Sequence, residues 1–386
     1  MQAIKQSMKQ KKSSMRWKKV GCLLALLFAF FVSGCSSLAQ TKESTVLQKT
    51  GTLELSYATQ FQAEEYGNCF LVTIGEDRYF LAPKDESLPQ ELPSDVTVLR
   101  TPLTQIYLAS SSCMDLYRGI DALSHVRFTG TKESDWYMKE ARDALEDGTI
   151  LYAGKYNLPD YEMLLEEDCS LAIENLMISH NPEVKEQLEN LGIPVLIEKS
   201  SLEDNPLGRM EWIKLHGLLT GKLEEAETYF EEQAEKVSQI DSMEAQGKTV
   251  AFFYLSSNGA VNVRTSSDYV SEMIRMAGGT YIFDDLEDED SNKATMNIQF
   301  EEFYASAKDA DYLVYNSTIG GEIESVSDLT EKNALFADFK AVKNGNVWCA
   351  KSNLFQQTTG VGDMILDFHN MLSGKDADFT YLVHLD

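Results

Sequence analysis

The chain is long and acidic. It has 386 residues, of which 43% are hydrophobic and 25% are charged, and its formal net charge is −27. This charge repels nucleic acid and anionic lipid headgroups within a Debye length, so the composition excludes a nucleic-acid-binding protein. The length exceeds that of one ordinary domain, and we therefore expect two lobes.

The N-terminus predicts export. Residues 1–19 carry seven Lys or Arg and no acid, and the apolar run "VGCLLALLFAFFVSGC" follows. A basic region followed by an apolar stretch too short to span a bilayer is typical of a signal peptide. Its end, "VSGC", resembles a bacterial lipobox, which implies cleavage before Cys35 and a lipid on that residue. The alternative is an uncleaved N-terminal anchor.

Loss of residues 1–34 removes positive charge only, so the net charge becomes about −34. The lipid, rather than the protein surface, must then hold the chain at the membrane.

Four cysteines lie beyond the signal peptide and Cys35: Cys69, Cys113, Cys169 and Cys349. Their spacing contains no CxxC pair and no zinc-binding pattern. An exported compartment permits disulfides, but Cys169 and Cys349 adjoin apolar runs and are equally consistent with buried thiols. The sequence therefore assigns no bridge.

Residues 35–50 are polar and aperiodic, which is typical of a tether. Over residues 51–100, alternating apolar and polar residues around Gly75 predict antiparallel strands in a hairpin or meander. From about residue 104, short apolar strands alternate with helices, which predicts a parallel or mixed sheet covered by helices. The predicted strands are "QIYLAS", "ILYAG", "SLAI" and "PVLIE", and the predicted helices begin near Met114, Asp135, Pro159 and Pro182.

The second half repeats this alternation after a long helix. The segment "NPLGRMEWIKLHGLLTG" predicts a helix broken at Thr220-Gly221, and apolar residues at 223, 226, 230, 234 and 237 have a helical period. Strands "TVAFFYLSSNG", "DYLVYNS" and "NVWCAK" follow, with helices near 268–277 and 360–373. We therefore predict an α/β fold of two lobes, 51–221 and 247–386, joined by one long helix over 222–246. A β-hairpin addition stands at the N-terminus.

Two acids occupy matching places in the two halves. In "DYEMLLEEDCSLAI" and "QFEEFYASAKDADYLVY", an aromatic residue precedes Glu162 or Glu301, and two apolar or aromatic residues and then a strand follow. Helix electrostatics alone explains one acid at a helix start, and Glu302 competes with Glu301 for the role. The other explanation is a binding partner that recognises both carboxylates.

These segments carry a resemblance to a known family. The chain resembles the substrate-binding lipoproteins of ABC importers for iron–siderophore, haem and cobalamin-type ligands, whose lobes are joined by one long helix. The resemblance covers about residues 104–373, and its motifs are the lipobox, "PDYEMLLEEDCSLAI", "LENLGIPVLIE", "NVRTSSDYVSEMIRMAGGTYIF", "FEEFYASAKDADYLVY" and "KNGNVWCAK". Cys169 stands where the family has Pro, Tyr281 stands where it often has Asn, and residues 51–100 are an elaboration outside the family pattern.

The resemblance implies a non-catalytic capture protein, lipid-anchored at the extracytoplasmic face of the cell membrane. In the family, one Glu on each lobe meets arginines on the two permease subunits, and Glu162 and Glu301 match those positions. Two charges on rigid helices set register and steer docking more than they add affinity. The implied ligand is first an iron chelate (siderophore), with haem or a corrinoid as alternatives, and no cofactor is implied.

Ligands of α/β sheets bind beyond the carboxyl ends of the strands. That rule selects loops 110–114, 130–136, 154–157, 174–177, 256–266, 316–321 and 351–357. Trp136, Tyr156 and Phe355 could stack on a planar or macrocyclic ligand, unless they pack in the core. Arg209 and Arg264 could pair with anionic groups, although Glu211 is an alternative partner for Arg209. The remaining candidates are Ser112, Met114 and Met177.

A direct metal-ion site is disfavoured, because no two of the five histidines (His125, His180, His216, His369 and His384) have ligand spacing. Tyr156 or Met177 could serve as axial ligands of a haem. The competing class is a lipid-anchored exported hydrolase. The sequence contains no nucleophile elbow, HExxH or Gly-rich phosphate loop, and the serines of "SSLED" and "RTSSD" have no histidine at a recognisable position.

Overall fold

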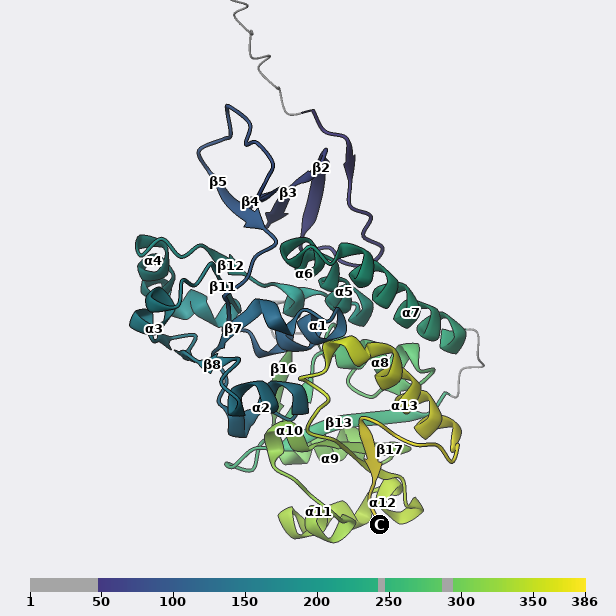
Figure 1. Cartoon of the computed structure of the whole chain (residues 1–386). Helices are drawn as coiled ribbons and strands as arrows, with labels where there is room; N and C mark the ends of the chain where they lie inside the picture. The colour runs from purple at the N-terminus through teal and green to yellow at the C-terminus, as the bar shows by residue number, and fades with distance from the viewer. Residues whose placement is uncertain (1–47, 242–246, 287–293) are drawn as a thin grey trace, which may run out of the picture. The chain divides into compact units, whose positions relative to one another are not determined.

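The computed structural model describes residues 48–241, 247–286 and 294–386. The predicted signal peptide, Cys35 and most of the predicted tether lie outside these residues. Within them, no helix combines the length and the apolar character needed to cross a membrane. Three larger β-sheets are formed, and Figure 1 shows them in chain order from purple to yellow.

The first sheet comes from the N-terminal region. Its strands β1 to β4 pair antiparallel in chain order, and β5 then joins β4 in parallel. Gly75, at φ +61°, makes the turn between β3 and β4. The predicted antiparallel meander is confirmed, whereas the parallel strand was not predicted. The strands are β1 (Gly51–Thr52), β2 (Gln62–Tyr66), β3 (Cys69–Ile74), β4 (Asp77–Pro83) and β5 (Val96–Thr101).

The second sheet is wholly parallel, in the order β12-β11-β6-β7-β8. All four residues of its central strand β11 are buried, as expected when helices cover both faces. The strands are β6 (Ile106–Leu108), β7 (Val126–Thr129), β8 (Leu151–Tyr152), β11 (Leu171–Glu174) and β12 (Val195–Ile197). The helices are α1 (Met114–Gly119), α2 (Lys139–Glu146), α3 (Tyr161–Glu166) and α4 (Pro182–Asn190). A small hairpin of β9 (Gly154–Lys155) and β10 (Leu158–Pro159) precedes α3.

Three helices follow in succession: α5 (Pro206–Glu211), α6 (Ile213–Thr220) and α7 (Leu223–Asp241). The predicted break at Thr220-Gly221 is confirmed, because Gly221 adopts φ +72° and ends α6. Of the predicted apolar positions on α7, Ala226, Phe230 and Val237 are buried. The helix packs against α6 and against α13 (Val361–Ser373), so it contacts both halves of the chain.

The third sheet is mixed, in the order β16-β14-β13-β17-β18-β19, with the short β15 beside β13. Its strands are β13 (Thr249–Leu255), β14 (Val261–Arg264), β15 (Thr280–Tyr281), β16 (Thr295–Ile298), β17 (Tyr312–Asn316), β18 (Val347–Ala350) and β19 (Leu382–His384). Its other helices are α8 (Tyr269–Met276), α9 (Phe300–Ala307), α10 (Ser317–Gly320), α11 (Val326–Lys332) and α12 (Lys340–Asn344). Helices α8 and α13 lie between this sheet and the helices α5 and α7 (Figure 1).

The predicted two-lobed α/β fold is confirmed, with local corrections. In the second half, strands β14, β15, β16 and β19 were not predicted. Strand β7 was not predicted, because its four residues include a polar arginine and carry too short an apolar signal. The helix expected near Asp135 begins at Lys139, after a single 3-10 turn over Glu133–Asp135. A single cluster of buried apolar residues runs from Leu53 to Leu385, so both lobes share one hydrophobic core.

Two buried carboxylates attach the N-terminal sheet to the first lobe. Glu211 accepts backbone N–H bonds from Ser56, Tyr57 and Ala58 at 2.7–2.8 Å, and the ammonium of Lys214 lies 2.8 Å away. Glu203 accepts bonds from the backbone of Thr59 and Gln60 and from the indole of Trp212. Each carboxylate therefore satisfies several otherwise unpaired backbone donors of the segment between β1 and β2.

We predict that Glu211→Gln lowers the free energy of unfolding by about 3 to 5 kcal/mol, because it leaves Lys214 buried without its counter-charge. Equilibrium denaturation in urea measures the change. The exposed Glu224 of α7 supplies the control, since Glu224→Gln should shift stability by less than about 0.5 kcal/mol. Equal effects of the two substitutions would contradict the role given to Glu211.

Candidate functional site

Three of the loops selected from the sequence meet in the structure. The strap, defined as residues 353–359 after β18, crosses to the first lobe and contacts the loops that follow β6 and β7. The side chain of Thr358 donates to the backbone carbonyl of Ser112 at 3.3 Å. The amide of Gln356 accepts from the N–H of Tyr137 and donates to the carbonyl of Asp135, both at 2.8 Å. The carboxyl edges of the two sheets therefore face each other here.

A buried acid fixes one end of the strap. Asp115, on α1, has no exposed surface, and its Oδ2 accepts from the N–H of Thr359 at 2.7 Å and from its hydroxyl at 2.6 Å. Arg118 pairs with the other oxygen at 2.6 Å and also donates to the hydroxyl of Thr359. The two lobes are thus joined by a charged network whose acid is fully buried and whose arginine is partly exposed.

An arginine–aromatic cluster lies beside the strap, and we define it by Arg209, Arg264, Asp268, Tyr269 and Phe355. The guanidinium of Arg209 stacks 3.9 Å from the ring centroid of Tyr269. That of Arg264 lies 4.8 Å from the Phe355 ring and 3.6 Å from Asp268. The rings of Tyr269 and Phe355 meet edge to face at 6.3 Å. Three of the residues selected from the sequence are therefore brought together across the two lobes.

Arg209 is the least satisfied member of this cluster. Glu211, its alternative partner from the sequence, binds Lys214 instead. Among the residues that the structure describes, Arg209 has no hydrogen-bond acceptor, and its stacking on Tyr269 leaves the guanidinium edge available. A half-buried guanidinium that lies over an aromatic ring presents a planar fork of donors to an anion.

The acid of the cluster is held away from water. Burial raises the pKa of Asp268, while the positive charge of Arg264 opposes that rise. Asp268 also caps α8 by accepting from the N–H of Val270 at 2.9 Å. A cavity of about 270 Å³ opens beside it, and Tyr269, Ser201 of the first lobe and Gln60 of the N-terminal segment contribute to its wall.

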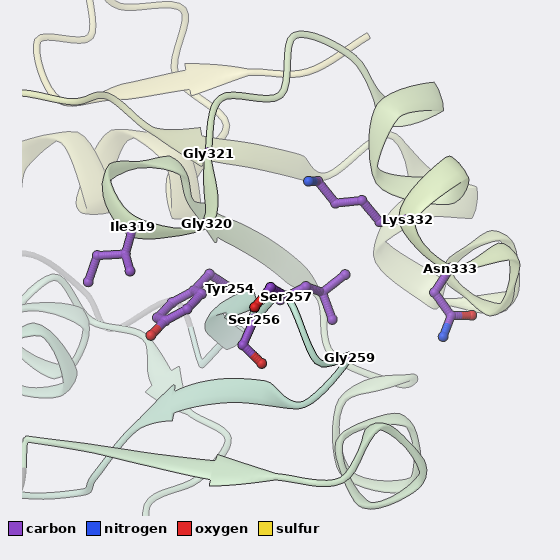
Figure 2. A pocket seen from close by; sticks show the side chains of 10 residues that line it. Tyr254, Ser256, Ser257, Gly259, Ile319, Gly320, Gly321, Lys332 and Asn333 are labelled. Atoms are coloured by element: carbon purple, nitrogen blue, oxygen red, sulfur yellow. The ribbon is translucent and has the colours of Figure 1, made fainter.

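A larger pocket of about 610 Å³ lies at the carboxyl end of β13 in the second lobe. Its wall comes from two of the selected loops, through Ser256, Ser257 and Gly259 of one and Ile319, Gly320 and Gly321 of the other. Figure 2 shows Lys332 reaching toward Gly321 from one side, with Tyr254 and Ser256 on another. A side chain at Gly320 would collide with Tyr315 and Tyr254, so this close approach requires glycine.

Several buried polar atoms without a partner lie near these strand ends. Among the described residues they include Nε1 of Trp136 after β7, both carboxyl oxygens of Glu174 at the end of β11, and Oδ1 of Asn353 in the strap. Buried polar groups in proteins are almost always hydrogen-bonded, so an unpaired one needs an explanation, such as a functional role. Here they mark the edge shared by the two lobes.

Four exposed apolar side chains also follow strands of the second and third sheets. Tyr137, Leu158, Met177 and Ile319 are between 48% and 76% exposed, and they follow β7, β8, β11 and β17 respectively. We call these four side chains the apolar rim, and they follow strand ends, where the ligands of α/β sheets bind. It suits a ligand with apolar surface.

The other residues selected from the sequence differ in how deeply they are buried. Met114 and Trp136 are buried in the hydrophobic core. Tyr156 packs partly buried against a satellite core of the first lobe, whereas Met177 is exposed. Ser112 is half-buried, and its hydroxyl meets that of Ser110 at 3.1 Å. Within the described ranges, no three His, Cys, Asp or Glu side chains stand close enough to hold a metal ion.

Glu162 and Glu301 occupy equivalent positions in the two sheets. Glu162 lies in the first turn of α3, which leads into the central parallel strand β11. Glu301 lies in the first turn of α9, which leads into β17, paired in parallel with β13 and β18. Both side chains are exposed, as is that of Glu302. The local pattern read from the sequence is thus present in both lobes.

Cys69, Cys113, Cys169 and Cys349 are all free and buried. Burial raises the pKa of each thiol, that of Cys169 to about 12. These side chains are therefore protonated packing residues, one of the two alternatives that the sequence left open.

Asp115, Asp268, Tyr269 and Thr359 were not among the candidates selected from the sequence, whereas Glu174 lies in the selected loop 174–177 without having been named. Asp115 directly follows the selected loop 110–114, and Asp268 with Tyr269 directly follow the loop 256–266. Extending each loop by a few residues would have found them, but nothing in the sequence pairs Asp115 with Thr359.

Comparisons with known proteins agree with this geometry. The pattern of a family described as periplasmic binding protein matches residues 106–354. A protein of Methanocaldococcus jannaschii described as an uncharacterized lipoprotein is 27% identical over 375 residues, covering 86% of this chain and 87% of its own.

Two solved structures share the fold. A TroA-like periplasmic binding protein from Veillonella parvula has a TM-score of 0.56 at 15% identity and covers 75% of this chain and 96% of its own. A periplasmic haem-binding protein from Pseudomonas aeruginosa also has a TM-score of 0.56 at 15% identity, with coverages of 73% and 98%.

Burial raises the pKa of Glu174 from 4.5 to about 8. Between these values the folded chain holds a proton that the unfolded chain has released, so stability must fall as pH rises through this window. We predict a loss of up to roughly 5 kcal/mol from about pH 4.5 to pH 8 from this group alone.

Glu174→Gln should remove that part of the pH dependence, as measured by urea denaturation at about pH 5 and about pH 9. The control is Glu166→Gln, at an exposed acid of α3, which should follow the original chain at both pH values. A Glu174→Gln variant with the original pH profile would show that this carboxyl does not titrate as expected.

Proposed function

Because the chain belongs to the periplasmic binding protein family, whose members bind solutes and are not enzymes, we propose that it captures an anionic metal chelate between its lobes. The chelate is an iron–siderophore complex, and the loaded protein delivers it to an ABC permease. The proposal rests first on the arginine–aromatic cluster, where the two lobes meet.

The proposal rests on the position of the Arg209 guanidinium and on its lack of an acceptor. This guanidinium lies over the Tyr269 ring, is half-buried, and has no acceptor in the described part of the chain. Arg264 adds a second positive charge, only partly offset by Asp268 at 3.6 Å. The site therefore offers charge-assisted hydrogen bonds to carboxylate or phenolate oxygens of a chelate, next to rings that can stack on it.

A haem or corrinoid is the second candidate, and the apolar rim favours it. Tyr137, Leu158, Met177 and Ile319 would cover the broad apolar faces of such a macrocycle. One of the structural relatives is described as a haem-binding protein. The two candidates differ in the contacts that would supply most of the binding affinity. A siderophore would depend on the two arginines, whereas a macrocycle would depend on the apolar rim.

We further propose that the chain is held at the extracytoplasmic face of the membrane through a lipid on Cys35. The sequence "VSGC" supports this placement, as does the relative from Methanocaldococcus jannaschii that is described as a lipoprotein. Anchoring keeps the captured ligand close to the permease, which raises the effective concentration of the loaded protein there.

Delivery depends on the two equivalent acids. Glu162 and Glu301 each project from a helix that is backed by the central part of a sheet, so their separation is set by rigid elements. They suit a permease with an arginine on each of its two subunits. Such exposed pairs contribute little affinity individually but fix the orientation in which the lobes are received.

We predict saturable quenching of tryptophan fluorescence when residues 36–386 are titrated with one ligand class among ferric siderophores, haem and corrinoids. For a ferric siderophore, Arg209→Ala should weaken binding about 10- to 100-fold, because a charge-assisted hydrogen bond is lost. Arg78→Ala, on the N-terminal sheet, is the matched control and should leave affinity unchanged.

Haem or corrinoid binding that survives Arg209→Ala would favour the second candidate. No quenching by any of the three classes would contradict the proposal.

We predict that Glu162→Ala and Glu301→Ala each reduce uptake of a labelled ligand up to about fivefold in cells, and more when combined, because each exposed pair contributes up to about 1 kcal/mol. Ligand binding by the purified variants should be unchanged. Glu166→Ala and Glu302→Ala, at exposed acids on the same helices, are the controls. Normal uptake by the double variant would overturn the docking role, and a defect in Glu302→Ala would move it to that residue.

A further inference from the structure

We infer that Gln356 is a positioning residue that holds the lobes together at the ligand-binding edge, and that the strap releases at this end while Thr359 stays anchored. The purpose of such a release, admission of the ligand, rests on the proposed function. The contacts themselves belong to the ligand-free chain and can be tested without any ligand.

The end that releases is held by neutral hydrogen bonds near water. The Gln356 side chain makes a paired contact, accepting from the N–H of Tyr137 and donating to the carbonyl of Asp135. Tyr137 is 48% exposed and Asp135 is exposed, so water can replace both bonds at little cost. No charge takes part in either bond.

The anchored end has the opposite character. Only three residues further along, Thr359 donates twice to Asp115, a fully buried carboxylate that also pairs with Arg118. Separation here would remove two hydrogen-bond donors from a buried carboxylate and leave it only Arg118, which is unfavourable. The contrast between the two ends makes Thr359 a pivot and Gln356 the end that can detach.

Release would act directly on the candidate site. Phe355 adjoins Gln356 in the strap and packs on Arg264 and Tyr269, so its ring must move when Gln356 detaches. Trp136 lies between the two residues that Gln356 contacts, and its buried Nε1 has no partner in the described residues. In the strap, Oδ1 of Asn353 is buried and unpaired in the same way. Both unpaired atoms thus belong to the two segments that the Gln356 contact joins.

Gln357 provides a matched comparison within the strap. It is the same residue type, and its side chain accepts from Asn353 at 2.9 Å, inside the strap itself. Among the described residues it makes no side-chain hydrogen bond to the first lobe. Removing Gln357 thus perturbs the strap to a similar degree without touching the contact between the lobes.

The test is backbone hydrogen exchange of the ligand-free protein, resolved at Tyr137 and Thr359. In Gln356→Ala, exchange at Tyr137 should accelerate at least tenfold, because its N–H loses its acceptor, while exchange at Thr359 stays as in the original chain. In Gln357→Ala both amides should keep their original rates. Gln356→Glu keeps an acceptor oxygen and should largely restore protection at Tyr137.

Two outcomes would overturn the inference. Unchanged exchange at Tyr137 in Gln356→Ala would show that Gln356 does not hold the loop. Acceleration at Tyr137 and Thr359 together, with an unchanged melting temperature, would show that the strap moves as a unit and has no pivot. Either result leaves the binding experiments untouched, so failure of this inference is distinguishable from failure of the proposed function.

Discussion

The buried carboxylate of Asp115 is the constraint from which the arrangement of the two lobes follows. It lies on the first helix of the parallel sheet, yet two of its hydrogen-bond donors belong to Thr359, which precedes the last long helix. A third donor is Arg118 of the same helix. A charge in this position is tolerated only when its partners are in place. The lobes are therefore fixed near Thr359, and movement between them must occur around that point. The shared hydrophobic core, to which α7 contributes, limits the movement further.

The site combines a short-range attraction for anions with a long-range field that opposes them. A net charge of −27 disfavours the approach of an anion, while salt screens that field beyond about one Debye length, roughly 8 Å at physiological ionic strength. Arg209 and Arg264 act within hydrogen-bond distance, where screening is weak and geometry decides. In the docking proposed above, the same acidic surface would attract basic permease subunits, and Glu162 and Glu301 would add to that attraction.

The N-terminal sheet is an addition to the family fold, and hydrogen bonds attach it to the first lobe. It lies outside residues 106–354, the part that matches the family, but Glu203 and Glu211 bind the segment after β1 through five or more hydrogen bonds. Gln60 of that segment reaches the wall of the cavity beside Asp268. The addition therefore stabilises α5, the helix that carries Arg209, and contributes surface to the seam between the lobes.

The sequence by itself determined the class of fold, most of the strands and helices, and the repeated pattern around Glu162 and Glu301. These features depend on local periodicity and on residues close together in the chain, which a sequence displays directly. It also selected Arg264 and Phe355, because loops after strands can be located from the strands themselves, and it selected Arg209 in the predicted helical segment "NPLGRMEW". Only the tertiary structure decided that these three form one cluster, that Lys214 rather than Arg209 pairs with Glu211, and that Trp136 is buried. Thr359, the partner of Asp115 in the second lobe, lies 244 residues away in the chain. Such contacts are set by how two sheets and their helices pack, and packing depends on the whole chain at once rather than on any local pattern.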